Sequence, residues 1–185
     1  MSERNTVVRS LHDLGLAAWF GGALMGVIGL NGAASKATSP TERLRLSSIG
    51  WARWAPVQWA AIVAHGIGSV ALIFSNAERL AVQPEGRTSA VVKFWVTIFA
   101  GVVTLYSALV GIRMGKHADE GATGVTEPGP TTSPKLASAQ RQQKVLQWLI
   151  PASTSVLIVL AAQQGEQQRP VAGLAKSKAK GLKRR

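Results

Sequence analysis

Four long segments without any Asp, Glu, Lys or Arg constrain the fold more than any other feature of the sequence. They are residues 14–34, 55–74, 94–112 and 145–162. A helix that crosses the hydrocarbon of a bilayer needs about 20 apolar residues, because it rises about 1.5 Å per residue. Lipid offers no partner to open backbone groups, so such segments are expected to be helical. The sequence predicts an all-α bundle of four transmembrane helices, and a soluble helical protein is the alternative.

The connection before the second span has a helix start of its own. Ser39 precedes Pro40, and Glu42 lies three residues after the serine, which is a capping box with proline at the first helical position. The helix it begins mixes arginine with leucine and tryptophan, so we expect an interfacial helix in the first loop. Four tryptophans are expected to anchor the spans at the interface: Trp51, Trp54, Trp59 and Trp148.

The remaining segments divide the chain into two parts. The connection at residues 117–139 is rich in Gly, Pro and Thr, so we expect disorder there. Residues 1–165 then form a four-helix transmembrane domain, and residues 166–185 form a disordered basic tail. Six cations of the tail are expected to contact anionic lipid headgroups: Lys176, Lys178, Lys180, Lys183, Arg184 and Arg185.

The charge distribution bears on location and partners. The net charge of +12 would suit a nucleic-acid binder, but the cations lie in loops and in the tail rather than on the apolar segments. With the tail counted, Lys and Arg favour cytoplasmic termini; without it, the bias reverses. The first span could also be a cleaved signal peptide, but its apolar core is longer than the roughly 7–15 residues usual there. We therefore expect a multi-pass protein of the cytoplasmic membrane.

The sequence offers little support for catalysis or metal binding. There is no cysteine, and the three methionines form no cluster. Walker, Rossmann and GxSxG motifs are also missing from the sequence. We therefore expect no enzyme activity, assign no catalytic residue and no metal site, and find no cofactor that the sequence requires.

One candidate site is a polar stripe on the second span, whose members share a helix face: Gln58, His65, Ser69 and Asn76. An ionisable residue at membrane depth is a functional candidate by default. The leading interpretation is nonetheless a neutral His65, hydrogen-bonded to Ser69 or to Thr104 or Thr154 from another span. The alternative is a proton carrier or cofactor ligand.

Haem can be tested by depth. If the first two spans pair antiparallel, His12 lies level with Asn76, roughly 16 Å along the axis from His65 at about 1.5 Å per residue. His12 and His65 would then not ligate one haem, and His117 at a membrane surface is no better partner. A haem between the His65 residues of two subunits is the one arrangement left open.

Small residues recur at intervals of four on two spans, a pattern that lets helix backbones approach closely. Gly22 and Gly26 form such a pair on the first span. Ala60, Ala64 and Gly68 continue the pattern on the second span. We expect these residues to pack helices together, within one chain or in a homo-oligomer.

Two stretches, "LHDLGLAAWFGGALMGVIGLNGAA" and "QRQQKVLQWLIPASTSVLIVLAAQQGEQQRP", resemble a family of small four-span membrane proteins of actinobacteria with no assigned activity. The start, "LHDLGLAAWFGG", also resembles the first helix of proteins related to the copper-resistance D membrane domain, and this resemblance carries no copper ligand onto the chain. A binding, scaffold or assembly component of a membrane complex is the expected function. The alternative is a protein that handles a small molecule, protons or redox cofactors (haem or quinone) through the His65 stripe.

Overall fold

The computed structural model describes residues 6–77 and 84–167, and all regular structure within them is helical. The first helix is α1 (Thr6–Met25), which continues through the π-helical turn η1 (Gly26–Leu30) into α2 (Asn31–Ala34). It is followed by α3 (Pro40–Ser75), α5 (Pro84–Lys116), the short 3-10 helix η2 (Ala118–Glu120) and α6 (Pro134–Gln167). Four of the described helical segments are long and apolar enough to cross a membrane, which confirms the predicted all-helical architecture with four such helices.

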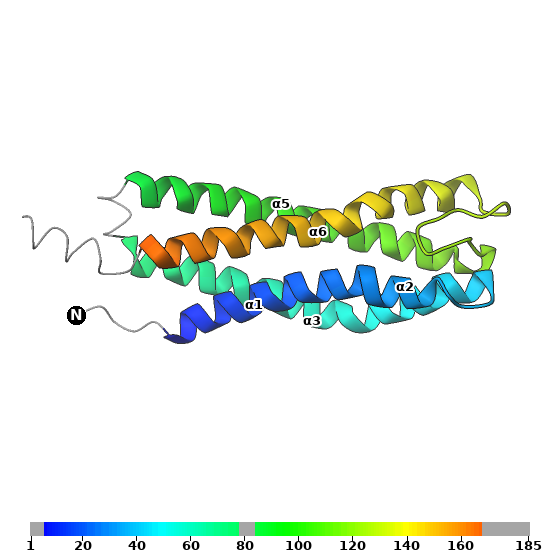
Figure 1. Ribbon diagram of the computed structural model, residues 1–185, viewed down its shortest axis with the longest axis horizontal. Coiled ribbons are helices and arrows are strands. Elements are labelled where there is room, and N and C mark those ends of the chain that lie inside the picture. Colours follow the sequence, from blue (N-terminus) through cyan, green and yellow to red (C-terminus); the bar gives the residue numbers. More distant parts are fainter. Residues whose placement is uncertain (1–5, 78–83, 168–185) are drawn as a thin grey trace, which may run out of the picture.

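The four long segments run antiparallel along one axis (Figure 1). α1 packs mainly on α3, α5 packs mainly on α6, and α1 also contacts α6. α3 and α5 contact each other much less. α1 begins and α6 ends at the same end of the bundle, which we call the terminal end. The opposite end, which we call the loop end, carries the turn between α2 and α3 and the connection between α5 and α6.

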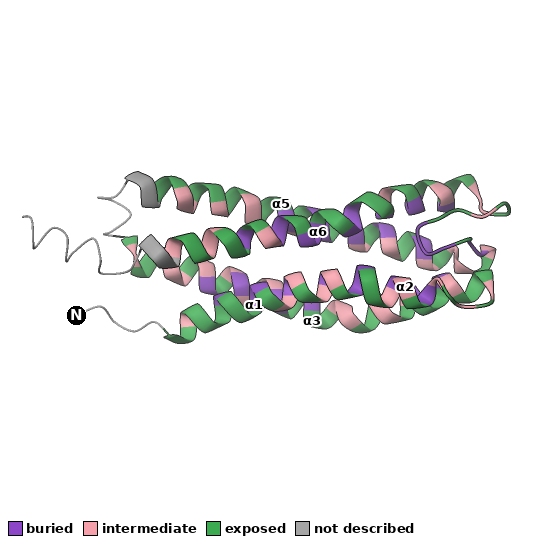
Figure 2. Cartoon of the chain, viewed as in Figure 1, coloured by how far each residue is buried: buried purple, intermediate pink, exposed green. Residues whose placement is uncertain are grey.

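The outer surface is unusually apolar, and the apolar core contains many polar residues. Large apolar side chains cover much of the outer surface, among them Val63, Ile67, Phe99, Val102 and Leu105. The buried positions between the helices (Figure 2) include many polar residues, among them His12, Asn31, Gln58, His65, Gln140 and Thr154. Exposed apolar surface on this scale marks a face that contacts lipid or protein rather than water.

α3 shows that one expectation was wrong. The helix does begin at Pro40 with Ser39 at the N-cap, but the serine hydroxyl bonds the hydroxyl of Thr41 and caps no backbone group. The residues assigned to an interfacial helix continue without a break into the second span. Only residues 35–39 separate α2 from α3, so α3 packs antiparallel to the first helix from its first turns onward, and Leu44 is already buried.

Two tryptophans of α3 fill the space that glycines leave on the first helix. A Cβ atom on Gly22 would overlap the ring of Trp54, and one on Gly26 would overlap the ring of Trp51. The assignment of Trp51 and Trp54 as interfacial anchors is therefore wrong. Both rings point into the bundle because they share a helix face with buried Gln58.

Gly68 is the buried member of the other small-residue pattern. A Cβ atom on Gly68 would lie 2.5 Å from the backbone nitrogen of His12, and one on Gly15 would lie 2.5 Å from the carbonyl oxygen of Ala61, so the two helices approach closely at both glycines. Ala60 is exposed and Ala64 is half-buried. Ala61 and His65, each one position after a predicted residue, are buried, and Gly68 is the one member of the predicted row that is buried with them.

The connection between α5 and α6 is ordered, so the predicted disorder is wrong. Ala122 and Val125 are buried in it. Arg43 of α3 donates to the carbonyl oxygens of Ala122 and Thr123, at 3.2 and 2.7 Å. Gln140 of α6 donates to the carbonyl oxygen of Val125 at 3.0 Å. These two side chains satisfy the backbone of the connection, which Gly and Pro would otherwise leave without regular partners.

The predicted basic tail cannot be compared with the structure, because the described residues end at Gln167. The six cations assigned to lipid contact all lie beyond that point: Lys176, Lys178, Lys180, Lys183, Arg184 and Arg185.

Candidate functional site

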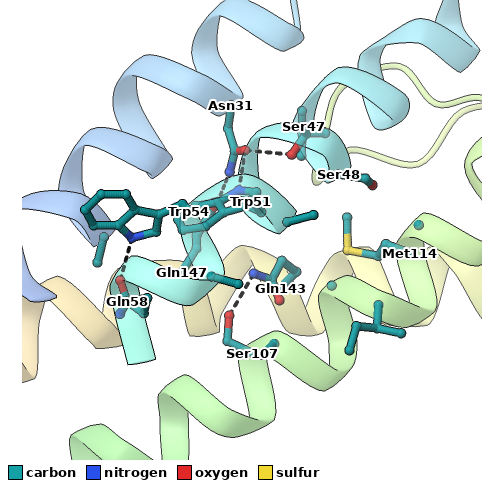
Figure 3. Close-up of a pocket in the computed structure, with 18 of the residues that line it drawn as sticks. Asn31, Ser47, Ser48, Trp51, Trp54, Gln58, Ser107, Met114, Gln143 and Gln147 are labelled. Atoms are coloured by element: carbon teal, nitrogen blue, oxygen red, sulfur yellow. Dashed lines mark hydrogen bonds between the residues drawn. The ribbon is translucent and has the colours of Figure 1, made fainter. Parts of the chain in front are cut away.

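A cavity of about 390 Å³ lies in the bundle between α3 and α5, two helices that pack mainly on other partners. It extends towards the loop end, where buried Val125 of the α5–α6 connection contributes to its wall. Its polar lining includes Asn31, Ser47, Gln58, Ser107, Gln143 and Gln147 (Figure 3). Trp51, Trp54 and Trp59 provide much of the apolar wall, and no described lining residue is charged.

Asn31 joins three helices beside this cavity. Its Nδ2 donates to Oε1 of Gln147 on α6 at 3.0 Å. Its Oδ1 accepts from the hydroxyl of Ser47 at 2.8 Å and from Nε1 of Trp51 at 3.0 Å, both on α3. The backbone N–H of Asn31 bonds the carbonyl of Gly26, five residues earlier, and so closes the π-helical turn. Such turns are frequent at functional sites, and this one sets the position from which Asn31 reaches both neighbouring helices.

Gln143 is the unsatisfied member of the lining. Its Nε2 donates to the hydroxyl of Ser107 on α5 at 2.9 Å, while its buried Oε1 has no partner among the described residues. Turning the amide over would only leave the amino end unpaired. A buried polar atom without a partner costs about 1–3 kcal/mol, and neighbouring protein atoms cover this oxygen almost completely. The amide oxygen of Gln58, in contrast, is paired, because Nε1 of Trp54 donates to it at 2.6 Å.

A second group of polar side chains lies towards the terminal end and is ionisable. His12 of α1 contacts Oδ1 of Asp13 through Nδ1 at 2.6 Å and Nζ of Lys93 through Nε2 at 2.7 Å. A carboxylate accepts and an ammonium donates, so this geometry fits a neutral His12 with its proton on Nδ1. The three side chains form a continuous chain of hydrogen bonds from α1 to α5.

His65 lies directly against this group. Its ring centroid is 4.4 Å from that of His12 and 6.1 Å from the ring of Trp19, and the residue is fully buried. Nδ1 of His65 is 3.1 Å from the carbonyl oxygen of His12. The predicted bond to Ser69, to Thr104 or to Thr154 is therefore wrong. Nε2 of His65 and the hydroxyl of Ser69 have no partner in the part of the chain that the structure describes.

The other residues of the predicted site are dispersed. Thr104 accepts from Nε1 of Trp19 at 3.1 Å and lines the cavity. Thr154 is buried and donates to the carbonyl of Ile150 one turn earlier. Asn76 ends α3 and donates to the carbonyl of Leu72. The predicted stripe thus contributes Gln58 and Thr104 to the cavity and His65 to the ionisable group, but it does not form one site.

The position of His12 corrects the depth assigned to it. His12 lies level with His65 and Gly68, not with Asn76. α1 begins at Thr6, well before the apolar segment, so His12 is already inside the helix that pairs with α3. The rings of His12 and His65 pack directly on each other and leave no space for a porphyrin between them in this arrangement.

Sequence reasoning missed Asn31, Gln143, Asp13 and Lys93 as site residues. Asn31 had a usable signal, because it is an amide inside an apolar span. Lys93 directly precedes the predicted third span and was excluded by the choice of boundary. Gln143 lies before the fourth apolar segment, in a stretch assigned to no element, although it is a helical residue.

No family model, curated protein or solved structure matches the chain. The resemblances to small four-span actinobacterial proteins and to the copper-resistance D membrane domain therefore stay predictions.

Proposed function

We propose that the chain is a multi-pass protein of the cytoplasmic membrane that binds a small uncharged molecule in the cavity between α3 and α5. The apolar outer surface and the four long helices support insertion in a bilayer. Lys and Arg are more numerous in the termini and in the connection between the second and third spans than in the other two connections, which supports cytoplasmic termini. The observation that carries the binding function is the cavity itself, whose lining combines amide, hydroxyl and tryptophan side chains without a charge.

The lining indicates the class of ligand. A volume of about 390 Å³ lies within the range of about 300–1,000 Å³ that is usual for small-molecule sites. Tryptophan walls favour a flat apolar ring, and the uncharged lining disfavours an ion. A carbonyl or hydroxyl on that ring would bond an amide or hydroxyl group of the lining. A neutral ring compound with one or two oxygens, such as a quinone, meets these requirements.

The experiment fills the cavity and leaves the fold intact. A Cβ on Gly111 meets no atom within 4 Å, and the residue lines the cavity, so the side chain in Gly111→Leu would extend into free space. Gly101→Leu is the matched control, because Gly101 lies on the same helix with equal room but does not line the cavity. Solvent extracts of the purified proteins are compared by mass spectrometry, and menadione is titrated by calorimetry.

We expect wild-type protein and Gly101→Leu to carry a compound that Gly111→Leu lacks, and to bind menadione more tightly than it does. Identical extracts and identical titrations for all three proteins would refute the proposal. Binding that survives in Gly111→Leu but not in Gly101→Leu would place the ligand elsewhere on the bundle.

A second candidate function, proton handling, is favoured by the bonded chain of Asp13, His12 and Lys93 and by the buried contact with His65. A histidine with a donor on one side and an acceptor on the other can pass a proton through its ring. Proteoliposomes loaded with a pH-sensitive dye test it: His12→Gln should abolish any proton flux that the wild-type protein supports. Absence of flux in the wild-type protein would remove this candidate.

A scaffold or assembly role remains a further proposal, supported by the exposed apolar faces of α3 and α5. A pull-down in mild detergent with mass spectrometry would find a second copy of the chain or a membrane partner. Recovery of the monomer alone, from native membranes at native abundance, would contradict it.

A further inference from the structure

A second cavity of about 400 Å³ opens at the terminal end of the bundle, bounded by α1, α3, α5 and α6. One part of its lining is polar and includes Arg9, His12, Asp13, Lys93 and Gln164. The other part is apolar and includes Leu16, Ala17, Ile158 and Ala161. The cavity is therefore amphipathic, with a different chemical character from the uncharged cavity described above.

The polar part carries a local excess of positive charge. Among the described lining residues, Arg9 and Lys93 are cations and Asp13 is the one carboxylate. Nε2 of His12 occupies one of the three N–H donors of the Lys93 ammonium, at 2.7 Å. Nδ1 of His12 is directed at Asp13, so the carboxylate is engaged by the histidine. An anion that enters the cavity would meet Lys93 with donors still available.

The two parts of the lining lie at different depths along the helices. Lys93 directly precedes the charge-free third segment, and Arg9 precedes the first segment by more than one turn. Leu16 and Ile158 lie inside the first and fourth segments. The polar part therefore lies near the headgroups of a bilayer and the apolar part lies in its hydrocarbon. Ala17 and Ala162 are exposed at the wall, so the cavity is open towards lipid.

We propose that this cavity binds one anionic phospholipid, with its phosphodiester at Lys93 and one acyl chain along Leu16, Ile158 and Ala161. The charge of the polar part and the depth of the apolar part require a ligand with both features. A free phosphate would leave the apolar part unfilled. A zwitterionic lipid would bring a cation beside Lys93.

The experiment measures lipid affinity on the full chain by native mass spectrometry after delipidation in detergent. Phosphatidylglycerol, phosphatidylcholine with the same acyl chains, and inorganic phosphate are the three probes. We expect one phosphatidylglycerol to bind more tightly than phosphatidylcholine. Lys93→Gln should lower the affinity for the first bound phosphatidylglycerol by about fivefold, which is the effect of one cation near anionic lipid. Lys116→Gln, an exposed cation at the loop end of α5, should leave it unchanged.

Ala162→Trp separates the site from a general charge effect and from misfolding. The position is lipid-exposed, so the larger side chain can be accommodated, and the variant keeps every charge while closing the cavity. Ala162→Trp should also lose the tight binding of one phosphatidylglycerol. Equal affinities for both lipids, or equal effects of Lys93→Gln and Lys116→Gln, would overturn the proposal. Displacement of phosphatidylglycerol by inorganic phosphate would assign the site to a free anion instead.

Discussion

Replacing Asn31 by leucine should destabilise the bundle more than any other single amide substitution. Its side chain makes three hydrogen bonds, to Gln147, Ser47 and Trp51, and these connect α2 with α3 and α6. Bonds between helices in a membrane contribute about 0.6–1.7 kcal/mol each. Three such bonds give a loss of about 2–5 kcal/mol, because leucine is similar in size but can neither donate nor accept.

Asn76→Leu is the matched control. Asn76 also donates through Nδ2, but to Leu72 of its own helix and at the end of α3, so its loss should cost little. The assay is equilibrium unfolding in mixed detergent and SDS micelles, followed by circular dichroism. Equal losses for Asn31→Leu and Asn76→Leu would refute the reasoning. So would a double variant with Gln147→Leu whose loss equals the sum of the two single losses, since bonded partners should couple.

Two further predictions concern packing and pH. Gly22→Leu should destabilise the bundle, because its side chain would overlap the ring of Trp54. Gly21→Leu should be tolerated, because a Cβ atom there meets no atom within 4 Å. Thermal unfolding of both variants in detergent checks this prediction, and equal midpoints would contradict it. The backbone N–H of Ser133 donates to Glu120 and lowers the pKa of that carboxyl below its ordinary value. Its contribution to stability is therefore present above the ordinary pKa and is lost as the pH falls through the lowered one. The amide NMR shift of Ser133 should therefore titrate with a midpoint below that of an unperturbed glutamate, about 4.3. A midpoint at or above that value would be the contrary result.

Apolar patterning predicted the helices because length and hydropathy alone decide whether a segment can span a bilayer. It failed at their ends. α1 begins at Thr6 and α6 at Pro134, since polar residues continue a helix wherever they have partners inside the bundle. Gln140 and Gln143 are such residues, and their bonds to the α5–α6 connection and to α5 cannot be seen in the sequence. The predicted start of the first span was several residues too late, and this error placed His12 too far from His65.

The cavity between α3 and α5 could not have been predicted by the same route. It exists because two long helices of similar composition pack on other partners and leave space between themselves. Which pairs of helices pack closely depends on a few fits, such as the ring of Trp54 on Gly22. The Gly22 and Gly26 spacing indicated a close approach, but not that tryptophan rings rather than a helix backbone would fill it.

The role of His65 can be decided by two substitutions. Its ring is buried against His12 and its Nδ1 lies 3.1 Å from the His12 carbonyl oxygen, so a packing role requires a polar group of similar reach. His65→Gln should then keep the stability of the bundle, because an amide can still donate to that carbonyl. His65→Leu should lose about 0.5–1.5 kcal/mol, the net contribution of one hydrogen bond. Glutamine does not titrate near neutral pH, so a residue that carries protons would fail equally in both variants. Unfolding in detergent and proton flux in proteoliposomes are measured on the same preparations. A glutamine variant of unchanged stability that loses wild-type proton flux would refute packing as the whole role of His65 and would establish proton handling.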